Sequence, residues 1–169
     1  MKVKIYFEPS ALFKAYIPEK GSENVEKILS MLGDEIIGLT SRWTILEIIR
    51  GIIKRRNLGE LAREDADDII KFFLYDLKKM EMERKLILID VSKKIIEGSI
   101  EYIIKHNLYA ADALHLKTAE IHSADAMLID DYHFKRIQGI TKMKLLNVDI
   151  DEKSFEKELK TILASKNLY

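Results

Sequence analysis

The feature that most limits the fold of this chain is the alternation of short apolar runs with longer helical patterns. Such alternation is typical of a parallel sheet with helices on both of its faces. We expect strands at Val3–Phe7, Glu35–Leu39, Leu86–Ile89, Ala126–Ile129 and Lys144–Val148. The sequence therefore predicts an α/β fold with three α/β/α layers, in which helices flank a central, mainly parallel sheet of four to five strands.

Between these runs, apolar residues recur at the spacing of a helix face. The expected helices span Ala11–Ile17, Ser22–Leu32, Glu64–Met80, Tyr109–His122 and Ser154–Ser165. Two more are expected after capping serines, one that follows Ser41 and extends to about Arg55 and one that follows Ser92 and extends towards His106. No linker, repeat or low-complexity segment divides the 169 residues, so we expect a single domain over residues 1–169.

Composition narrows the possible chemistry. The 28 basic and 28 acidic residues cancel, so any binding of nucleic acid must come from a local basic patch. Cysteine is absent, which excludes disulfides, thiolate zinc sites and cysteine nucleophiles and fits a cytoplasmic location. No apolar run approaches the roughly 18 residues of a membrane span, so we expect no membrane association.

Four acidic residues follow strands or lie on helices that follow strands in this layout. Glu8 comes after the first strand, Glu47 lies in the third helix, Asp112 begins a later helix and Asp131 follows the fourth strand. The carboxyl ends of parallel strands share one edge of the sheet, where ligands bind. Carboxylates gathered there repel one another unless a cation lies among them. Because oxygen ligands suit Mg²⁺ and Mn²⁺ better than zinc, the sequence predicts a site for one or two such ions.

Three of these acids also have a purely structural interpretation. Glu8 precedes Pro9 and could belong to a helix N-terminus. Glu47 could form an ion pair with Arg50, and Asp112 could simply interact with the dipole of its helix.

The neighbours of the first and last acids leave further alternatives open. Asp130 stands beside Asp131, so either could face the metal while the other is a turn residue, and the spacing to His133 and Phe134 favours Asp131. Ser10 either caps the first helix or donates a hydrogen bond to a carboxylate or a water.

Histidine and basic residues complete the candidates. His115 lies three residues after Asp112 on the same helix face, where we expect it to be buried and hydrogen-bonded rather than catalytic. His106, His122 and His133 show no metal-ligand spacing among themselves. The candidate phosphate contacts are Lys14, Arg42, Lys54 and Arg55, although Lys54 and Arg55 could instead only complement the dipole at the C-terminal end of their helix.

The segments that carry these acids resemble the PIN domain family, in particular the toxin ribonucleases of VapBC toxin–antitoxin systems. VKIYFEPSALFKAYIPEKGSE resembles the family's first strand, acid, serine and following helix. LTSRWTILEIIRGIIKR resembles its second strand and glutamate-bearing helix, and NLYAADALHLKTAEIHSADAMLIDDYHF carries its two remaining acidic positions. The likeness is strongest over residues 3–137, and the helix at 154–165 lies outside the pattern.

The resemblance implies a Mg²⁺- or Mn²⁺-dependent endoribonuclease that cuts single-stranded RNA with a metal-activated water and leaves a 5′-phosphate and a 3′-hydroxyl. In the matching positions, the catalytic and metal-binding residues would be Glu8, Glu47, Asp112 and Asp131, supported by Ser10 and Asp130. The family normally has Asp where this chain has Glu8, so the alternative is a PIN-fold binding or scaffold module with weakened catalysis.

The resemblance also implies partners. A cognate antitoxin protein would bind near the site, and PIN toxins commonly form homodimers through helices. Phe72, Phe73 and Tyr75 in the helix from Glu64 could supply an apolar dimer surface or could equally belong to the core.

Overall fold

The computed structural model describes residues 2–166, with side chains for residues 2–165. One sheet contains the strands β1 (Val3–Phe7), β2 (Ile36–Ser41), β3 (Leu86–Ile89), β4 (Ala126–Ile129) and β5 (Lys144–Asn147). Their order is β3-β2-β1-β4-β5, and all four neighbouring pairs are parallel. The predicted α/β/α fold is confirmed, and the described part of its sheet has five strands.

Helices connect the strands and cover the sheet. They are α1 (Pro9–Phe13), α2 (Ser22–Ser30), α3 (Trp43–Asn57), α4 (Arg63–Met82), α5 (Lys93–His106), α6 (Ala110–Ile121), α7 (Asp131–Ile137) and α8 (Glu152–Lys166). Helix α7 was not among the expected helices, because one of the aspartates at its start was interpreted as a turn residue. Within residues 2–166, no helix is both long enough and apolar enough to cross a membrane.

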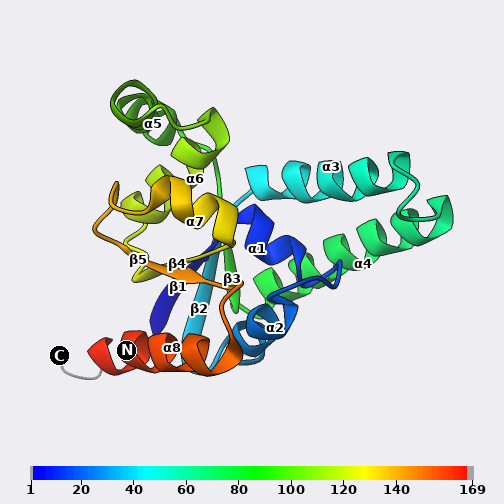
Figure 1. The fold of residues 1–169 in the computed structure, drawn as a ribbon, viewed down its shortest axis with the longest axis horizontal. Coiled ribbons are helices and arrows are strands. Elements are labelled where there is room, and N and C mark those ends of the chain that lie inside the picture. Colours follow the sequence, from blue (N-terminus) through cyan, green and yellow to red (C-terminus); the bar gives the residue numbers. More distant parts are fainter. Residues whose placement is uncertain (1, 167–169) are drawn as a thin grey trace.

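Alternating side chains on the strands divide the core into two layers, as expected when both faces of a sheet are buried. Ile5 and Phe7 of β1 belong to the layer that packs against α1, α2, α3, α4 and α8. Tyr6, between them, belongs to the layer beneath α5, α6 and α7. Figure 1 shows these two groups of helices on either side of the sheet, with α3 and α4 extending beyond it as a pair.

Three aromatic residues of α4, which the sequence assigned either to the core or to a dimer surface, differ in burial. Phe73 is fully buried and contacts Tyr16 edge to face, with ring centroids 5.0 Å apart. Phe72 and Tyr75 are 60% and 68% exposed. Phe73 therefore belongs to the core, and only the other two remain available to a partner.

The central position of β1 sets the location of the site. Phe7, its last residue, pairs with Leu128 of β4, and the Glu8 amide donates to the Leu128 carbonyl at 3.0 Å. On the other side, the Thr40 hydroxyl of β2 donates to the Phe7 carbonyl at 2.8 Å. The residues that follow β1 and β4 thus emerge side by side at the carboxyl edge of the sheet.

Candidate functional site: an acidic pocket at the carboxyl edge

Glu8 follows β1 directly and is the N-cap of α1. Its carboxylate accepts hydrogen bonds from the Ser10 amide at 2.8 Å and from the Ser10 hydroxyl. The side chain is buried, and this burial raises the pKa of Glu8 even though the nearby His133 and His115 oppose the rise. Ser10 therefore acts as a donor to a carboxylate, and the cap of α1 is Glu8 itself.

Asp112 lies in the first turn of α6, and its side chain is also buried. Its Oδ1 is 3.7 Å from His133 Nε2 and its Oδ2 is 3.4 Å from Arg136 Nη2. Burial raises the pKa of Asp112 in spite of these two cations. Asp112 Oδ2 makes no hydrogen bond within residues 2–165, so one oxygen of a buried carboxylate lacks a short donor.

His133 lies between the carboxylates. Asp130, the N-cap of α7, accepts hydrogen bonds from the His133 amide at 2.9 Å and from His133 Nδ1 at 2.7 Å. Burial lowers the pKa of His133, but the Asp130 hydrogen bond and the charges of Glu8, Asp130 and Asp112 outweigh it and raise that pKa to about 9. At neutral pH the ring is therefore an imidazolium surrounded by three carboxylates.

The same contacts hold Asp130 ionised. Although burial opposes it, hydrogen bonding from His133 keeps the pKa of Asp130 below its usual value. His133 was not predicted as a site residue, because the histidines show no metal-ligand spacing among themselves. A pattern that could have indicated its role is Asp130 three residues earlier at a helix start, since an N-cap carboxylate reaches the backbone of the third helical residue.

Asp131 points elsewhere. Its carboxylate accepts from Lys135 Nζ at 2.6 Å and from Asn147 Nδ2 at 3.3 Å, and 45% of its side chain is exposed. The cause is geometric, because a cap side chain folds over the helix end whereas the next residue is rotated by about 100° around the axis. We call the site formed by Glu8, Asp112 and Asp130 around His133 the acidic pocket. Asp131, which the sequence had favoured, is not part of it.

Glu47 reaches the edge of the pocket from α3. Its Oε2 is 2.5 Å from His115 Nε2, and His115 Nδ1 is 2.7 Å from the Tyr6 hydroxyl. With the tyrosine donating to Nδ1, the imidazole donates its own proton to Glu47. His115 has no exposed surface, so the expectation of a buried and hydrogen-bonded histidine is confirmed. The negative charge of Glu47 contributes to the raised pKa of Asp112, which places both acids at one site.

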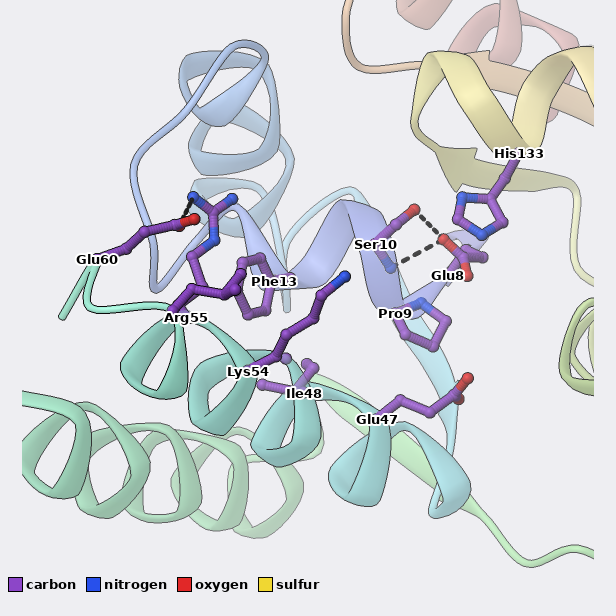
Figure 2. A pocket seen from close by; sticks show the side chains of 12 residues that line it. Glu8, Pro9, Ser10, Phe13, Glu47, Ile48, Lys54, Arg55, Glu60 and His133 are labelled. Carbon is purple, nitrogen blue, oxygen red and sulfur yellow. Dashed lines mark hydrogen bonds and ion pairs between the residues drawn. The ribbon is translucent and has the colours of Figure 1, made fainter. Parts of the chain in front are cut away.

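A cavity of about 590 Å³ opens from the acidic pocket between α1 and α3. Figure 2 shows Glu8 and His133 at one end of this cavity and Arg55 with Glu60 at the other. Gly51 allows α3 to approach the Phe13 ring closely, since a Cβ at this position would lie only 2.8 Å from that ring. The lining residues are Glu8, Pro9, Ser10, Phe13, Glu47, Ile48, Gly51, Lys54, Arg55, Leu58, Glu60 and His133.

Two predicted phosphate contacts line this cavity. Lys54 extends from α3 towards α1 (Figure 2), and it forms no ion pair with any side chain of residues 2–165. Arg55 is partly neutralised, because it pairs with Glu19 at 2.5 Å and with Glu60 at 3.1 Å. Of the two, Lys54 is the cation better placed to meet an anionic ligand.

The other two predicted phosphate contacts lie outside the cavity. Lys14 is buried, and its ammonium contacts Glu19 and Asp149, each at 3.0 Å, and the Lys20 carbonyl at 2.8 Å. Two carboxylates and a carbonyl thus already engage the ammonium, so the structure does not support Lys14 as a phosphate contact. Arg42 is exposed and pairs with Asp90 and Glu81 near the start of α3.

The donor set of the pocket fits a hard divalent cation. Glu8, Asp112 and Asp130 offer oxygen ligands from three segments, and Asp112 Oδ2 lacks a hydrogen bond. Within residues 2–165, no three acidic or histidine side chains already stand at ligand separation from one point. The His133 imidazolium contacts two of the three acids and supplies the positive charge that such an ion would bring.

Comparison with known proteins gives one family match and several structures of similar fold. The family model described as PIN domain matches residues 5–140. The chain resembles FitAcB from Neisseria gonorrhoeae, with a TM-score of 0.59 and 15% identity over 85% of this chain and 97% of that one. No curated protein matches the sequence.

Two further solved structures carry descriptive names. A toxin-antitoxin complex from Klebsiella pneumoniae gives a TM-score of 0.55 and 16% identity over 85% of this chain and 97% of that one. Mycobacterium tuberculosis VapC20, described as a sarcin-ricin loop cleaving toxin, gives a TM-score of 0.54 and 10% identity over 73% of this chain and 86% of that one. At such identities these similarities show a shared fold.

Proposed function

This chain belongs to the PIN domain family, and on that premise we propose that it is a metal-dependent endoribonuclease that cuts single-stranded RNA and acts as the toxin of a toxin–antitoxin pair. The observation that carries the proposal is the convergence of Glu8, Asp112 and Asp130 around one cationic ring beside an open cavity. The repulsion among these acids, two of which are buried, is offset in this structure by His133 and Arg136, and a bound divalent cation would offset it further. A site for binding a cation is the simplest reason to keep them.

Glu8, Asp112 and Asp130 would hold Mg²⁺ or Mn²⁺, with Glu47 at the edge of the site. The bound ion supplies positive charge for the scissile phosphate and lowers the pKa of a bound water. Ser10 fixes the Glu8 carboxylate with two hydrogen bonds. One ion or two would satisfy this donor set, and metal titration of the protein would separate these cases.

The other residues of the pocket orient these acids. His115, anchored by Tyr6, holds the Glu47 carboxylate by a hydrogen bond of 2.5 Å. Lys54, at the cavity wall, is placed to bind an RNA phosphate next to the one that is cut. Arg55 could assist once RNA competes with its two glutamate partners.

The substrate and the partner are proposed by analogy with proteins of the same fold. VapC20 is described as a sarcin-ricin loop cleaving toxin, and the Klebsiella pneumoniae structure is a toxin-antitoxin complex. By analogy, an antitoxin would cover the acidic pocket and keep this chain inactive. A homodimer is part of the proposal, and Phe72 and Tyr75 are exposed aromatic residues that could contribute to it. The absence of cysteine fits action in a reducing, cytoplasmic setting.

The test is cleavage of a single-stranded RNA by the purified chain with Mn²⁺ or Mg²⁺. We expect cleavage that stops with EDTA and falls by about 100-fold or more in Asp112→Asn, because one of the carboxylates around the ion is lost. Asp68→Asn, at an exposed position on α4, is the matched control and should cleave like the wild type. Cleavage that persists in Asp112→Asn, or no cleavage with either ion, would contradict the proposal.

A second candidate function is a PIN-fold binding module with little catalysis. It is favoured by Glu8, whose carboxylate is already engaged as the cap of α1. Glu8→Asp distinguishes the two candidates, because it restores the family's usual acid at the same position. Turnover at the wild-type level in both forms supports the nuclease, and turnover that appears only in Glu8→Asp supports the binding module.

A further inference from the structure

Two exposed tyrosines stand at the rim of the acidic pocket on either side of one arginine. Tyr109 is the N-cap of α6 and is 64% exposed, and Tyr132, in the first turn of α7, is 59% exposed. The Arg136 guanidinium carbon lies 3.7 Å from the centroid of the Tyr109 ring and 5.6 Å from that of the Tyr132 ring. Arg136 Nη1 also donates a hydrogen bond of 3.2 Å to the Tyr132 hydroxyl.

These side chains are connected to the pocket itself. Arg136 Nη2 is 3.4 Å from Asp112 Oδ2, the buried oxygen without a hydrogen bond. The Tyr132 ring meets the His133 ring edge to face, with centroids 5.1 Å apart at 85°. The two rings are therefore held at a fixed position next to the carboxylates instead of moving freely in solvent.

The fold itself does not account for this exposure. More than half of the surface of each tyrosine is exposed, so packing within the fold contributes little to holding these residues in place. Their helix starts are not stabilised by the phenol groups, since the cap of α7 is Asp130 and Tyr109 makes no side-chain cap hydrogen bond. Exposed aromatic rings next to a guanidinium are the groups on which unpaired nucleobases stack.

The position of the rings also complements the cavity. In Figure 1, α6 and α7 lie on one side of α1 and α3 lies on the other. Lys54 belongs to α3, whereas Tyr109 begins α6 and Tyr132 and Arg136 belong to α7. An RNA strand with its phosphate at the acids could therefore contact a cation on α3 and the rings on α6 and α7.

We propose that Tyr109, Arg136 and Tyr132 form a stacking platform that binds one unpaired nucleobase of the RNA beside the scissile phosphate. The inference rests on the proposed function and adds how the chain selects unpaired RNA, because a paired base keeps its faces inside the helix stack and cannot reach the rings. Arg136 has a double role, since it supports both rings and faces Asp112.

The test measures RNA binding without cleavage, with the full chain in EDTA. Two fluorescently labelled probes of equal length and charge are compared, a single-stranded oligoadenylate and an abasic strand with the same backbone. The variants are Tyr109→Leu and Tyr132→Leu, with Tyr109→Phe and Tyr132→Phe as ring-preserving forms. Ile104→Ala, which removes an exposed apolar side chain from α5, is the control.

Each leucine variant should bind oligoadenylate about tenfold more weakly, as expected for one lost stacking contact, and should bind the abasic strand like the wild type. The phenylalanine forms should retain most of the affinity, and Ile104→Ala should match the wild type. Leucine variants that bind oligoadenylate normally, or lose affinity equally for both probes, overturn the platform. A wild-type chain that binds neither probe in EDTA overturns the platform alone, whereas the proposed nuclease fails only if RNA is not cut with Mn²⁺ or Mg²⁺, so the two failures are distinguishable.

Discussion

Replacement of His133 by glutamine should remove a pH-dependent part of the folding stability. The pKa of the ring rises from 6.5 to about 9 because, against the effect of burial, Asp130, Glu8 and Asp112 favour the charged form. At about 1.4 kcal/mol per pKa unit, this rise corresponds to about 3 kcal/mol. Since 23% of the side chain is exposed, solvent screening reduces the value, and we expect about 2 to 3 kcal/mol.

The sign follows from proton linkage. The folded protein holds the His133 proton more tightly than the unfolded chain, so the stabilisation is fully present below the unfolded pKa of 6.5. It is lost as the pH rises through about 9. Glutamine can still donate to Asp130 but carries no charge, so the variant lacks this dependence on pH.

The assay is urea unfolding of wild type and His133→Gln in EDTA, over a pH series from about 6 to about 10. The free energy of unfolding of the wild type minus that of the variant should fall by about 2 to 3 kcal/mol across the series. A nuclear magnetic resonance titration of the ring should give a midpoint of about 9. A difference that stays constant, or that grows with pH, would refute the reasoning.

Two other outcomes follow from the geometry. Asp130→Asn keeps a good helix cap but removes a charge from the pocket, so RNA cleavage should fall by about 100-fold. Asp131→Asn should cleave within about twofold of wild type, and equal losses in the two variants would count against the assignment of Asp130. Phe73→Ala should lower the free energy of urea unfolding by about 3 to 5 kcal/mol, and Phe72→Ala should lower it by less than about 1 kcal/mol. Similar values for both variants would contradict the difference in burial.

The regular elements could be predicted from the sequence because each has its own pattern. The bounds predicted for β1, β3 and β4 agree with the structure, since these strands are short apolar runs between polar residues. Ser92 was correctly predicted to cap α5, and its hydroxyl accepts from the Ile95 amide at 3.4 Å. Such features depend only on residues that are close together in the sequence, so the sequence alone predicts them.

Helix α7 could not be predicted in the same way. It spans only seven residues, too few for an apolar periodicity to stand out. Without this helix, the direction of Asp130 and Asp131 was undetermined, and the choice between them depended on spacing to His133 and Phe134. A one-residue difference at a helix start decides which carboxylate turns towards the sheet edge and which turns to solvent.

Residues that act through distant partners were also missed. The contacts of His133 with Asp112 and of Arg136 with Tyr109 join segments more than 20 residues apart in the sequence. No local pattern marks such pairs, because they depend on how β1 and β4 place the starts of α6 and α7. In contrast, Glu8, Glu47 and Asp112 were predicted as site residues because each lies in a segment that resembles the PIN domain family.

The central claim is that Glu8, Asp112 and Asp130 together bind the divalent cation that RNA cleavage needs. The most direct measurement is anomalous diffraction at the manganese edge from a crystal of this chain soaked in Mn²⁺. The account predicts a strong anomalous peak in contact with carboxylate oxygens of all three residues, with the His133 ring displaced from among them. A peak bound by Asp131 with Asp130 uninvolved, or no peak in the acidic pocket, would contradict it.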